Sequence, residues 1–303
     1  MTRSEGRVFS RGDTGGSVGV ITQRPADSCG HACRSSCKDL RGRGLIGQRY
    51  GRRMCFDPDS HPPVAPIAGA AVSHEDLVLT SADGTAFAAF AAHPDGPPQG
   101  AGVVLLPDVR GLYGFYEELA LRFAERGHPA VAFDYFGRTA GAAKRDDAFE
   151  YMPHVKQVSP AHVRDDVAAA IAHLRTLGAE RVVAVGFCFG GRHAWLAAAD
   201  GHGLAGAVGF YGTPGERNGE PGAIQRAGEI AAPVLALMGG DDHAIGPEQV
   251  AALDQALTDA GVEHEVVTYP GAPHSFFDRK QEAFAAESAD AWERTLAFLA
   301  AHG

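Results

Sequence analysis

The sequence predicts an α/β fold built on one doubly wound, mostly parallel sheet with helices on both faces, in a three-layer α/β/α arrangement. Two observations lead to this prediction. Apolar runs typical of strands alternate with helical segments from residue 101 to the C-terminus. Some of these runs, such as residues 101–106 and 233–238, are apolar almost throughout, as is typical of strands buried on both faces of a parallel sheet.

The expected elements begin with a hairpin in which two short strands, 76–80 and 85–92, flank an Asp83-Gly84 turn. Later strands are expected at 101–106, 130–133, 182–185, 204–210, 233–238 and 263–269. Helices are expected at 115–126, 161–177, 247–260 and 283–302, with a further helical segment that opens at Gly190.

Two long connections interrupt this alternation. Residues 137–159 are rich in charge and aromatics, and loops of this length usually carry function or are disordered. They end at Ser159-Pro160, a pair that starts the next helix. Residues 212–228 form the second long loop.

The composition excludes several classes of protein. The net charge of −10 argues against a nucleic-acid binder. No apolar run approaches the length of a membrane span, and residues 1–30 lack the apolar core of a signal peptide. We therefore expect a cytoplasmic protein without nucleic-acid or membrane partners. We further expect a small-molecule substrate and a monomer or small homo-oligomer.

The N-terminal part differs from the rest of the chain. Residues 1–53 hold 11 Lys and Arg against 4 Asp and Glu, with ten glycines and no apolar periodicity. Such a segment cannot bury enough surface to offset its ordering entropy, so we expect residues 1–57 to be a disordered basic extension. A second hypothesis is that translation starts at Met54. A Pro/Ala-rich arm at 58–74 would lead into a single domain at 75–303.

Cysteines cluster in this extension. Cys29, Cys33 and Cys37 recur at every fourth position, with His31 between the first two. A metal site is one interpretation, but the spacing matches neither the usual zinc pairs nor the common iron–sulfur runs. We therefore predict no metal site here, and the catalytic mechanism argued below requires no metal or organic cofactor.

The segment RVVAVGFCFGG at residues 181–191 organises the domain. An apolar strand stops at Gly186, Cys188 follows, and Gly190 and Gly191 open a helix. This G-x-C-x-G pattern is a nucleophile elbow with cysteine in place of the usual serine. The glycines suit a turn too tight for side chains, and the helix N-terminus favours a thiolate. An inert, buried cysteine beside a glycine-rich turn is the alternative interpretation.

Two further residues support a catalytic interpretation. Asp242 follows the strand at 233–238, and His274 follows the strand at 263–269. Each could instead be a turn former. The order nucleophile, acid, histidine is that of α/β-hydrolases, and the sheet topology would bring all three strand ends to one edge. In this triad, imidazole takes the thiol proton while the carboxylate orients the imidazole.

On these residues the chain from about 75 to 303 resembles the dienelactone hydrolase family. The resemblance is carried by the cysteine elbow, by the Gly-Gly-x-Asp242-His243 turn and by His274-Ser275-Phe276. The segment 108–126 and residues 134–138 are also similar to the family. The resemblance implies an α/β-hydrolase fold and hydrolysis of a small ester or lactone through a cysteine acyl-enzyme.

The resemblance also implies roles for other residues. The backbone N–H groups of Phe189 and Val109 would hold the oxyanion. Asp108 stands where known members carry a glutamate that contacts the resting thiol, so it is a candidate for tuning Cys188. The candidates for substrate binding are Arg145, Phe149, Ser275 and Arg279. Arg279 is offset by one residue from the family pattern. The substrate itself could be an ester or lactone with or without a carboxylate group.

Two other functions stay open at this point. A thioesterase or peptide hydrolase would keep the fold and change the leaving group. A non-catalytic binding module on a hydrolase scaffold is the third hypothesis, although a retired site has no reason to keep nucleophile, acid and histidine together.

Overall fold

The computed structural model describes residues 60–146, 148–278 and 282–303, all within the compact unit Arg52–Gly303. Some predictions fall outside the described residues and stay predictions. They concern the extension at 1–57 with its cysteines, the translation start at Met54, and the role of Arg279.

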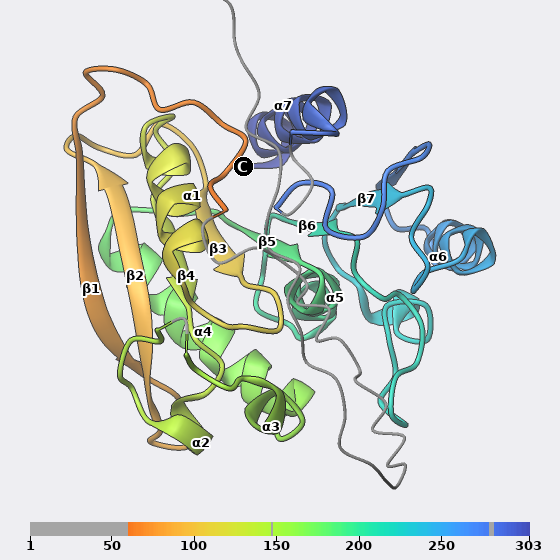
Figure 1. Ribbon diagram of the computed structural model, residues 1–303, viewed down its shortest axis with the longest axis horizontal. Helices are drawn as coiled ribbons and strands as arrows, with labels where there is room; N and C mark the ends of the chain where they lie inside the picture. The colour runs from red at the N-terminus through yellow and green to blue at the C-terminus, as the bar shows by residue number, and fades with distance from the viewer. Residues whose placement is uncertain (1–59, 147, 279–281) are drawn as a thin grey trace, which may run out of the picture. The chain divides into compact units, whose positions relative to one another are not determined.

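Eight strands form one sheet in the described part of the chain, in the order β1-β2-β4-β3-β5-β6-β7-β8 (Figure 1). The first two strands run antiparallel to their neighbours and the remaining pairs are parallel, which confirms the predicted mostly parallel sheet. The strands are β1 (Val72–Thr80), β2 (Ala86–Pro94), β3 (Gly102–Leu106), β4 (Ala130–Phe133), β5 (Val182–Phe187), β6 (Gly206–Phe210), β7 (Val234–Gly239) and β8 (His264–Tyr269).

Helices cover both faces of this sheet, as predicted (Figure 1). One face packs against α1 (Gly114–Ala124) and α7 (Ala285–His302), and the other against α4 (Pro160–Thr176), α5 (Phe189–Ala199) and α6 (Pro247–Asp259). Shorter turns of helix are α2 (Gly137–Ala140), α3 (Met152–Val155) and η1 (Ala227–Glu229). In the ranges that the structure describes, no helix has the length and apolar character needed to cross a membrane.

The buried central strands explain why the two cores form. Side chains alternate between faces along a strand, so Val103 and Leu105 enter the core under α1 while Val104 and Leu106 enter the opposite one. All four side chains are fully buried. An apolar run without polar interruption is therefore what a strand with helices on both sides requires.

Two element boundaries differ from the prediction. The segment 58–74 ends inside β1, because Val72 pairs with Pro94 across the antiparallel hairpin. Ser73, His74 and Glu75 are exposed on this edge strand, so no apolar alternation marks its start. The long connection 137–159 also contains α2 and α3, two helices too short to leave a periodic pattern.

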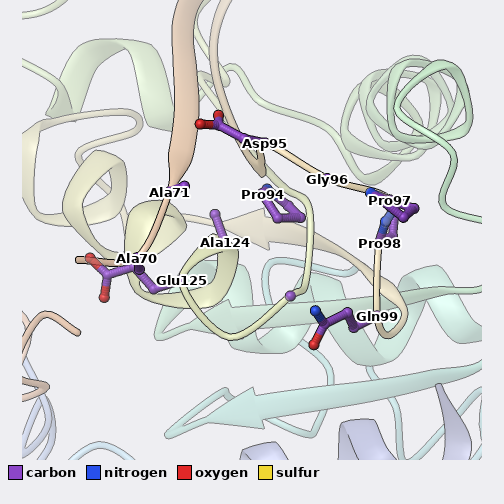
Figure 2. Close-up of a pocket in the computed structure, with 11 residues that line it drawn as sticks. Ala70, Ala71, Pro94, Asp95, Gly96, Pro97, Pro98, Gln99, Ala124 and Glu125 are labelled. Carbon is purple, nitrogen blue, oxygen red and sulfur yellow. The ribbon is translucent and has the colours of Figure 1, made fainter. Parts of the chain in front are cut away.

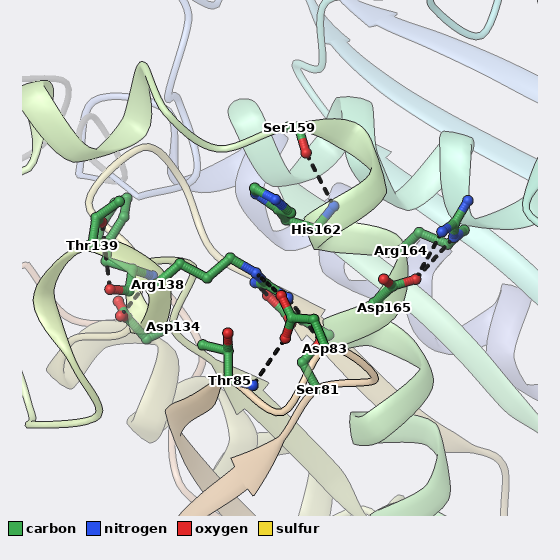
Figure 3. Close-up of polar contacts among 12 residues, drawn as sticks. Ser81, Asp83, Thr85, Asp134, Arg138, Thr139, Ser159, His162, Arg164 and Asp165 are labelled. Carbon is green, nitrogen blue, oxygen red and sulfur yellow. Dashed lines mark hydrogen bonds and ion pairs between the residues drawn. The ribbon is translucent and has the colours of Figure 1, made fainter.

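Arg138 in α2 ties the hairpin to the helical layer (Figure 3). Its guanidinium pairs with Asp83 in the hairpin turn at 2.7 Å and with the buried Asp166 of α4 at 2.9 Å. At the start of α4, the Ser159 hydroxyl accepts the His162 N–H at 3.3 Å, which confirms the predicted helix start. The long connection is therefore anchored at both of its ends.

Candidate active site

Cys188 lies at the apex of a sharp turn between β5 and α5, where the sequence places the elbow. Its backbone has φ 54° and ψ −110°, outside the regions that side chains favour. Such a conformation costs on the order of 1–3 kcal/mol and persists only where the surroundings enforce it. Here the Cys188 N–H donates to the Phe210 carbonyl at 2.9 Å, and the Cys188 carbonyl accepts the Arg192 N–H.

The glycines of the elbow are required by close backbone contacts. A Cβ on Gly186 would come within 2.1 Å of the Gly190 carbonyl oxygen. One on Gly190 would lie 1.9 Å from the Leu106 carbonyl oxygen, and one on Gly191 would lie 2.6 Å from that of Phe210. No heavier residue fits at these positions without moving the backbone, so the chain can present Cys188 at this turn only with glycine around it.

Asp242 and His274 meet at the same edge of the sheet, after β7 and β8. The His274 Nδ1 lies 2.7 Å from Asp242 Oδ2. The other Asp242 oxygen accepts the Ala244 N–H at 2.8 Å, and the Asp242 side chain is 1% exposed while that of His274 is 25% exposed. A buried carboxylate thus holds a solvent-accessible imidazole in one orientation.

Tyr211 connects this pair to the elbow. Phe187 and Phe210 are paired at the ends of the parallel strands β5 and β6. Cys188 and Tyr211 directly follow them, so both residues lie at neighbouring strand ends. The Tyr211 ring centroid lies 5.1 Å from that of His274. The three residues of the predicted triad therefore follow strands that all end at one edge of the sheet.

Val109 and Phe189, the predicted oxyanion donors, also lie at this edge. Leu106 of β3 pairs with Gly186 of β5, so the loop that carries Val109 begins beside the elbow. Phe189 is the first residue of α5, where backbone N–H groups lack intrahelical partners. An anion at this point would meet both the free N–H groups and the positive end of the helix.

Asp108 is buried beside the elbow and already has hydrogen-bond donors. Its Oδ1 accepts the Arg110 N–H at 2.8 Å, and its Oδ2 accepts the Tyr113 hydroxyl at 3.3 Å. Its own N–H donates to the Tyr116 hydroxyl at 2.9 Å. Burial raises the pKa of Asp108 to about 6, although the Arg110 N–H and guanidinium act in the opposite direction.

The Arg145 guanidinium is paired with the carboxylate of Asp134 and is not directed at open space. Its guanidinium donates to Asp134 Oδ2 at 2.9 Å and to the carbonyls of Ala140 and Gly141, and its side chain is only 7% exposed. The guanidinium also lies 4.7 Å from the Phe149 ring centroid. Substrate binding by Arg145 stays a prediction, and this arrangement gives the residue a structural partner.

The remaining predicted substrate contacts differ in accessibility. Phe149 is partly exposed and stacks on His154, with ring centroids 4.9 Å apart. Ser275 is buried, and its φ of 61° places it in the left-handed region. Their contact with a substrate stays a prediction.

Sequence reasoning missed three polar residues at this edge. They are Arg110, whose guanidinium lies 3.8 Å from the Tyr113 ring centroid, together with Tyr211 and Asp278. Tyr211 could have been found, because it directly follows the apolar strand that ends at Phe210. Asp278 carried no such signal, since it lies four residues beyond His274 in an irregular segment.

Arg192 shapes the loop after β6. Its buried guanidinium donates to four backbone carbonyls, those of Thr213, Gly215, Glu220 and Pro221. Because Arg192 belongs to the first turn of α5, the loop is fastened to the helix that starts directly after Cys188.

The pocket in Figure 2 lies away from this site. Its volume is about 350 Å³, and Gln99 and Gly127 in its lining precede β3 and β4. It therefore opens at the amino ends of the parallel strands, opposite the edge that carries Cys188. In parallel α/β sheets ligands bind at the carboxyl ends of the strands. We therefore place the candidate active site at the elbow, where the reactive side chains lie, and not at this pocket.

The fold and the residues at its carboxyl edge define the class of protein first. An eight-stranded, mostly parallel sheet with a cysteine elbow and a histidine–aspartate pair after its last two strands is an α/β-hydrolase. The dienelactone hydrolase family profile matches residues 87–303, and the chain belongs to this family. It is a hydrolase of the carboxymethylenebutenolidase-like kind.

Individual relatives agree with this assignment. A carboxymethylenebutenolidase from Rhodococcus opacus is 31% identical over 81% of this chain and 96% of its own. A crystal structure of a candidate dienelactone hydrolase from Klebsiella pneumoniae is 29% identical and covers 76% of this chain and 99% of its own, with a TM-score of 0.67. A dienelactone hydrolase-like promiscuous phosphotriesterase from metagenomic libraries is 26% identical over 77% and 99% of the two chains, with a TM-score of 0.65.

Proposed function

We propose that this hydrolase cleaves a small ester or lactone through an acyl-enzyme on Cys188. The observation that carries the proposal is the 2.7 Å contact between His274 Nδ1 and the buried Asp242, at the sheet edge where the elbow ends. With the Nδ1 proton directed at Asp242, the Nε2 atom of His274 is left as the base. This tautomer follows from the hydrogen bond.

The reaction would run in two halves. His274 Nε2 takes the proton of the Cys188 thiol as Sγ attacks the carbonyl carbon, and the tetrahedral oxyanion is held by the N–H groups of Phe189 and Val109. The C–O bond to the leaving alcohol then breaks, and His274 returns the proton to that oxygen. In the second half, His274 takes a proton from water as the hydroxide attacks the thioester carbonyl. The C–S bond then breaks, the imidazolium returns its proton to the Cys188 sulfur, and the acid is released.

Replacing the nucleophile tests this proposal. Cys188→Ala should lower turnover of aryl esters and lactones by a factor on the order of 10³ or more, because no acyl-enzyme can form. Val78→Ala, at an exposed position of the edge strand β1, is the control and should keep full activity. Rapid-quench mass spectrometry of the wild type should show one added acyl group on Cys188. Unchanged turnover by Cys188→Ala would remove this residue from the mechanism.

The substrate panel decides between related leaving groups. Thioesters and peptides belong in it, because the same two half-reactions would serve them. Phosphotriesters belong in it as well, because the metagenomic relative acts on that class of compound by its description. A strong preference for a phosphotriester over every carboxylic ester would replace the ester or lactone as the substrate class.

A further inference from the structure

The peptide group between Pro107 and Asp108 is held by two tyrosine hydroxyls. The Tyr135 hydroxyl donates to the Pro107 carbonyl at 2.7 Å, and the Tyr116 hydroxyl accepts the Asp108 N–H at 2.9 Å. Both tyrosines are buried. Because the carbonyl and the N–H belong to one planar unit, hydrogen bonds at both of its ends fix the orientation of the plane.

The two tyrosines reach this peptide group from opposite faces of the sheet. Tyr116 belongs to α1 and to the core beneath it, where its ring centroid lies 5.6 Å from that of Phe187. Tyr135 follows β4 and belongs to the other core, where its ring centroid lies 5.1 Å from that of Phe189. Phe187 and Phe189 flank Cys188, so each tyrosine also packs against the elbow.

The loop after β3 and the elbow are in direct backbone contact. An added Cβ on Gly190 would lie 2.4 Å from the Pro107 carbonyl oxygen, the atom to which Tyr135 donates. Leu106, the residue before Pro107, is paired with Gly186 of β5. A rotation of the held peptide group would therefore change the fit between the loop and the start of α5.

Pro107 explains why side chains hold the backbone here. Proline has no N–H, so the hydrogen-bond ladder of β3 cannot continue through it. The chain leaves the sheet after Leu106, and buried backbone polar groups need partners from elsewhere. Burial raises the pKa of Tyr116 and of Tyr135 well above its ordinary value, so both hydroxyls stay protonated at neutral pH.

Among the described residues, one backbone N–H in this loop has no hydrogen-bond partner. The Asp108 carbonyl accepts the Gly111 N–H at 3.1 Å. The carbonyl and N–H of a trans peptide point in opposite directions, so the Val109 N–H is turned away from this bond. The N–H groups of the neighbouring residues, 108 and 110–112, all donate to protein atoms. The loop therefore keeps a single donor available, and it is the predicted oxyanion donor.

We propose that Tyr116 and Tyr135 are positioning residues of the reaction, and that their hydroxyls fix the loop so that the Val109 N–H is directed at the oxyanion formed beside Cys188. This inference rests on the proposed function, because the oxyanion belongs to that reaction. Loss of one donor from such a site costs on the order of 10²–10³-fold in turnover, and a misplacement of about 1 Å can cost about 10²-fold.

Two rates at Cys188 separate this positioning from a general disturbance of the elbow. Acylation by an aryl ester develops an oxyanion, whereas alkylation by iodoacetamide displaces iodide from a saturated carbon and develops none. Tyr135→Phe keeps the ring against Phe189 and removes the hydroxyl. Acylation in a rapid-quench experiment should then slow by about 10²-fold while alkylation keeps its rate. Tyr269→Phe, whose hydroxyl donates to Asp290 at 2.8 Å, is the control and should change neither rate.

Tyr116→Phe is the second variant. It removes the acceptor of the Asp108 N–H and should show the same difference between the two rates. Full-rate acylation in both variants would overturn the proposal. Equal slowing of acylation and alkylation would also overturn it, because the thiol itself would then be disturbed.

If neither variant folds, a crystal structure of the wild type with an aryl trifluoromethyl ketone decides. Cys188 Sγ adds to the ketone carbon, the thiol proton passes to His274, and the ketone oxygen becomes an oxyanion. With both tyrosine hydrogen bonds in place, this oxygen should lie about 2.7–3.1 Å from the Val109 nitrogen. An oxygen out of reach of that nitrogen would overturn the proposal.

These outcomes are separable from those of the proposed function. A wild type that acquires no acyl group on Cys188 would remove the acyl-enzyme, and with it the oxyanion that the loop would hold. A wild type that is acylated, together with full-rate acylation of Tyr116→Phe and Tyr135→Phe, would keep the acyl-enzyme and remove the role of the tyrosines.

Discussion

Asp134 and Asp278 are both carboxyls with no exposure to solvent, and they are stabilised in opposite ways. Asp134 accepts N–H groups from Arg145, Leu112 and Phe136. Neither Asp278 oxygen accepts a hydrogen bond of good geometry from the described residues, and burial raises the pKa of Asp278 well above its ordinary value. A carboxylate with a full set of donors serves as a fixed anion, whereas one without donors is left to hold a proton.

The largest effect on the free energy of unfolding is expected at Asp134, the carboxylate with a full set of donors. Arg145→Met would leave the Asp134 carboxylate buried without its cation, which should cost about 3–5 kcal/mol in the free energy of unfolding. Urea unfolding at pH 7 measures it. Arg164→Met is the matched control, since Arg164 and its partner Asp165 are much more exposed and their pair should contribute little. A loss below that of the control would show that Asp134 does not depend on Arg145.

A middle-sized effect is expected from changing the donors of Asp108. Tyr113→Phe removes the hydroxyl that Asp108 accepts, which should destabilise the fold by about 1–2 kcal/mol. Urea unfolding at pH 7 measures the loss. Tyr269→Phe, which removes a hydroxyl that donates to the exposed Asp290, is the control and should cost less.

The smallest effect is expected at Ser275. Its hydroxyl is buried without a hydrogen bond of good geometry, so Ser275→Ala should change the free energy of unfolding by less than about 1 kcal/mol at pH 7. Thermal unfolding monitored by circular dichroism measures the change. A loss of several kcal/mol would mean that Ser275 holds Asp278 through a bond stronger than its geometry indicates.

Much of the fold could be predicted because its cause is local. The alternation in which Val103 and Val104 enter opposite cores is visible as an uninterrupted apolar run. The start of β1 could not be predicted, because Ser73, His74 and Glu75 join an exposed edge and are held by pairing to β2 instead of by burial. Edge strands lack the pattern that burial imposes on central ones.

The site divides in the same way. Residues that lie within a few positions of a strand end, such as Cys188 and Asp242, were predicted because the topology alone brings strand ends together. Partnerships between loops were not predictable. Arg145 meets Asp134 through the folding of the long connection, and Asp278 is buried in an irregular segment after β8. Such contacts leave no periodic trace in the sequence.

The hydrogen bonds from Arg192 to the loop after β6 have a consequence for engineering. The held carbonyls lie at 213, 215, 220 and 221, so residues 216–219 project between them as an exposed tip. At this tip Arg217 and Glu220 exchange two backbone hydrogen bonds around Asn218-Gly219. A tag or reporter peptide inserted between Asn218 and Gly219 would extend a clamped turn outward into solvent and leave the elbow helix undisturbed.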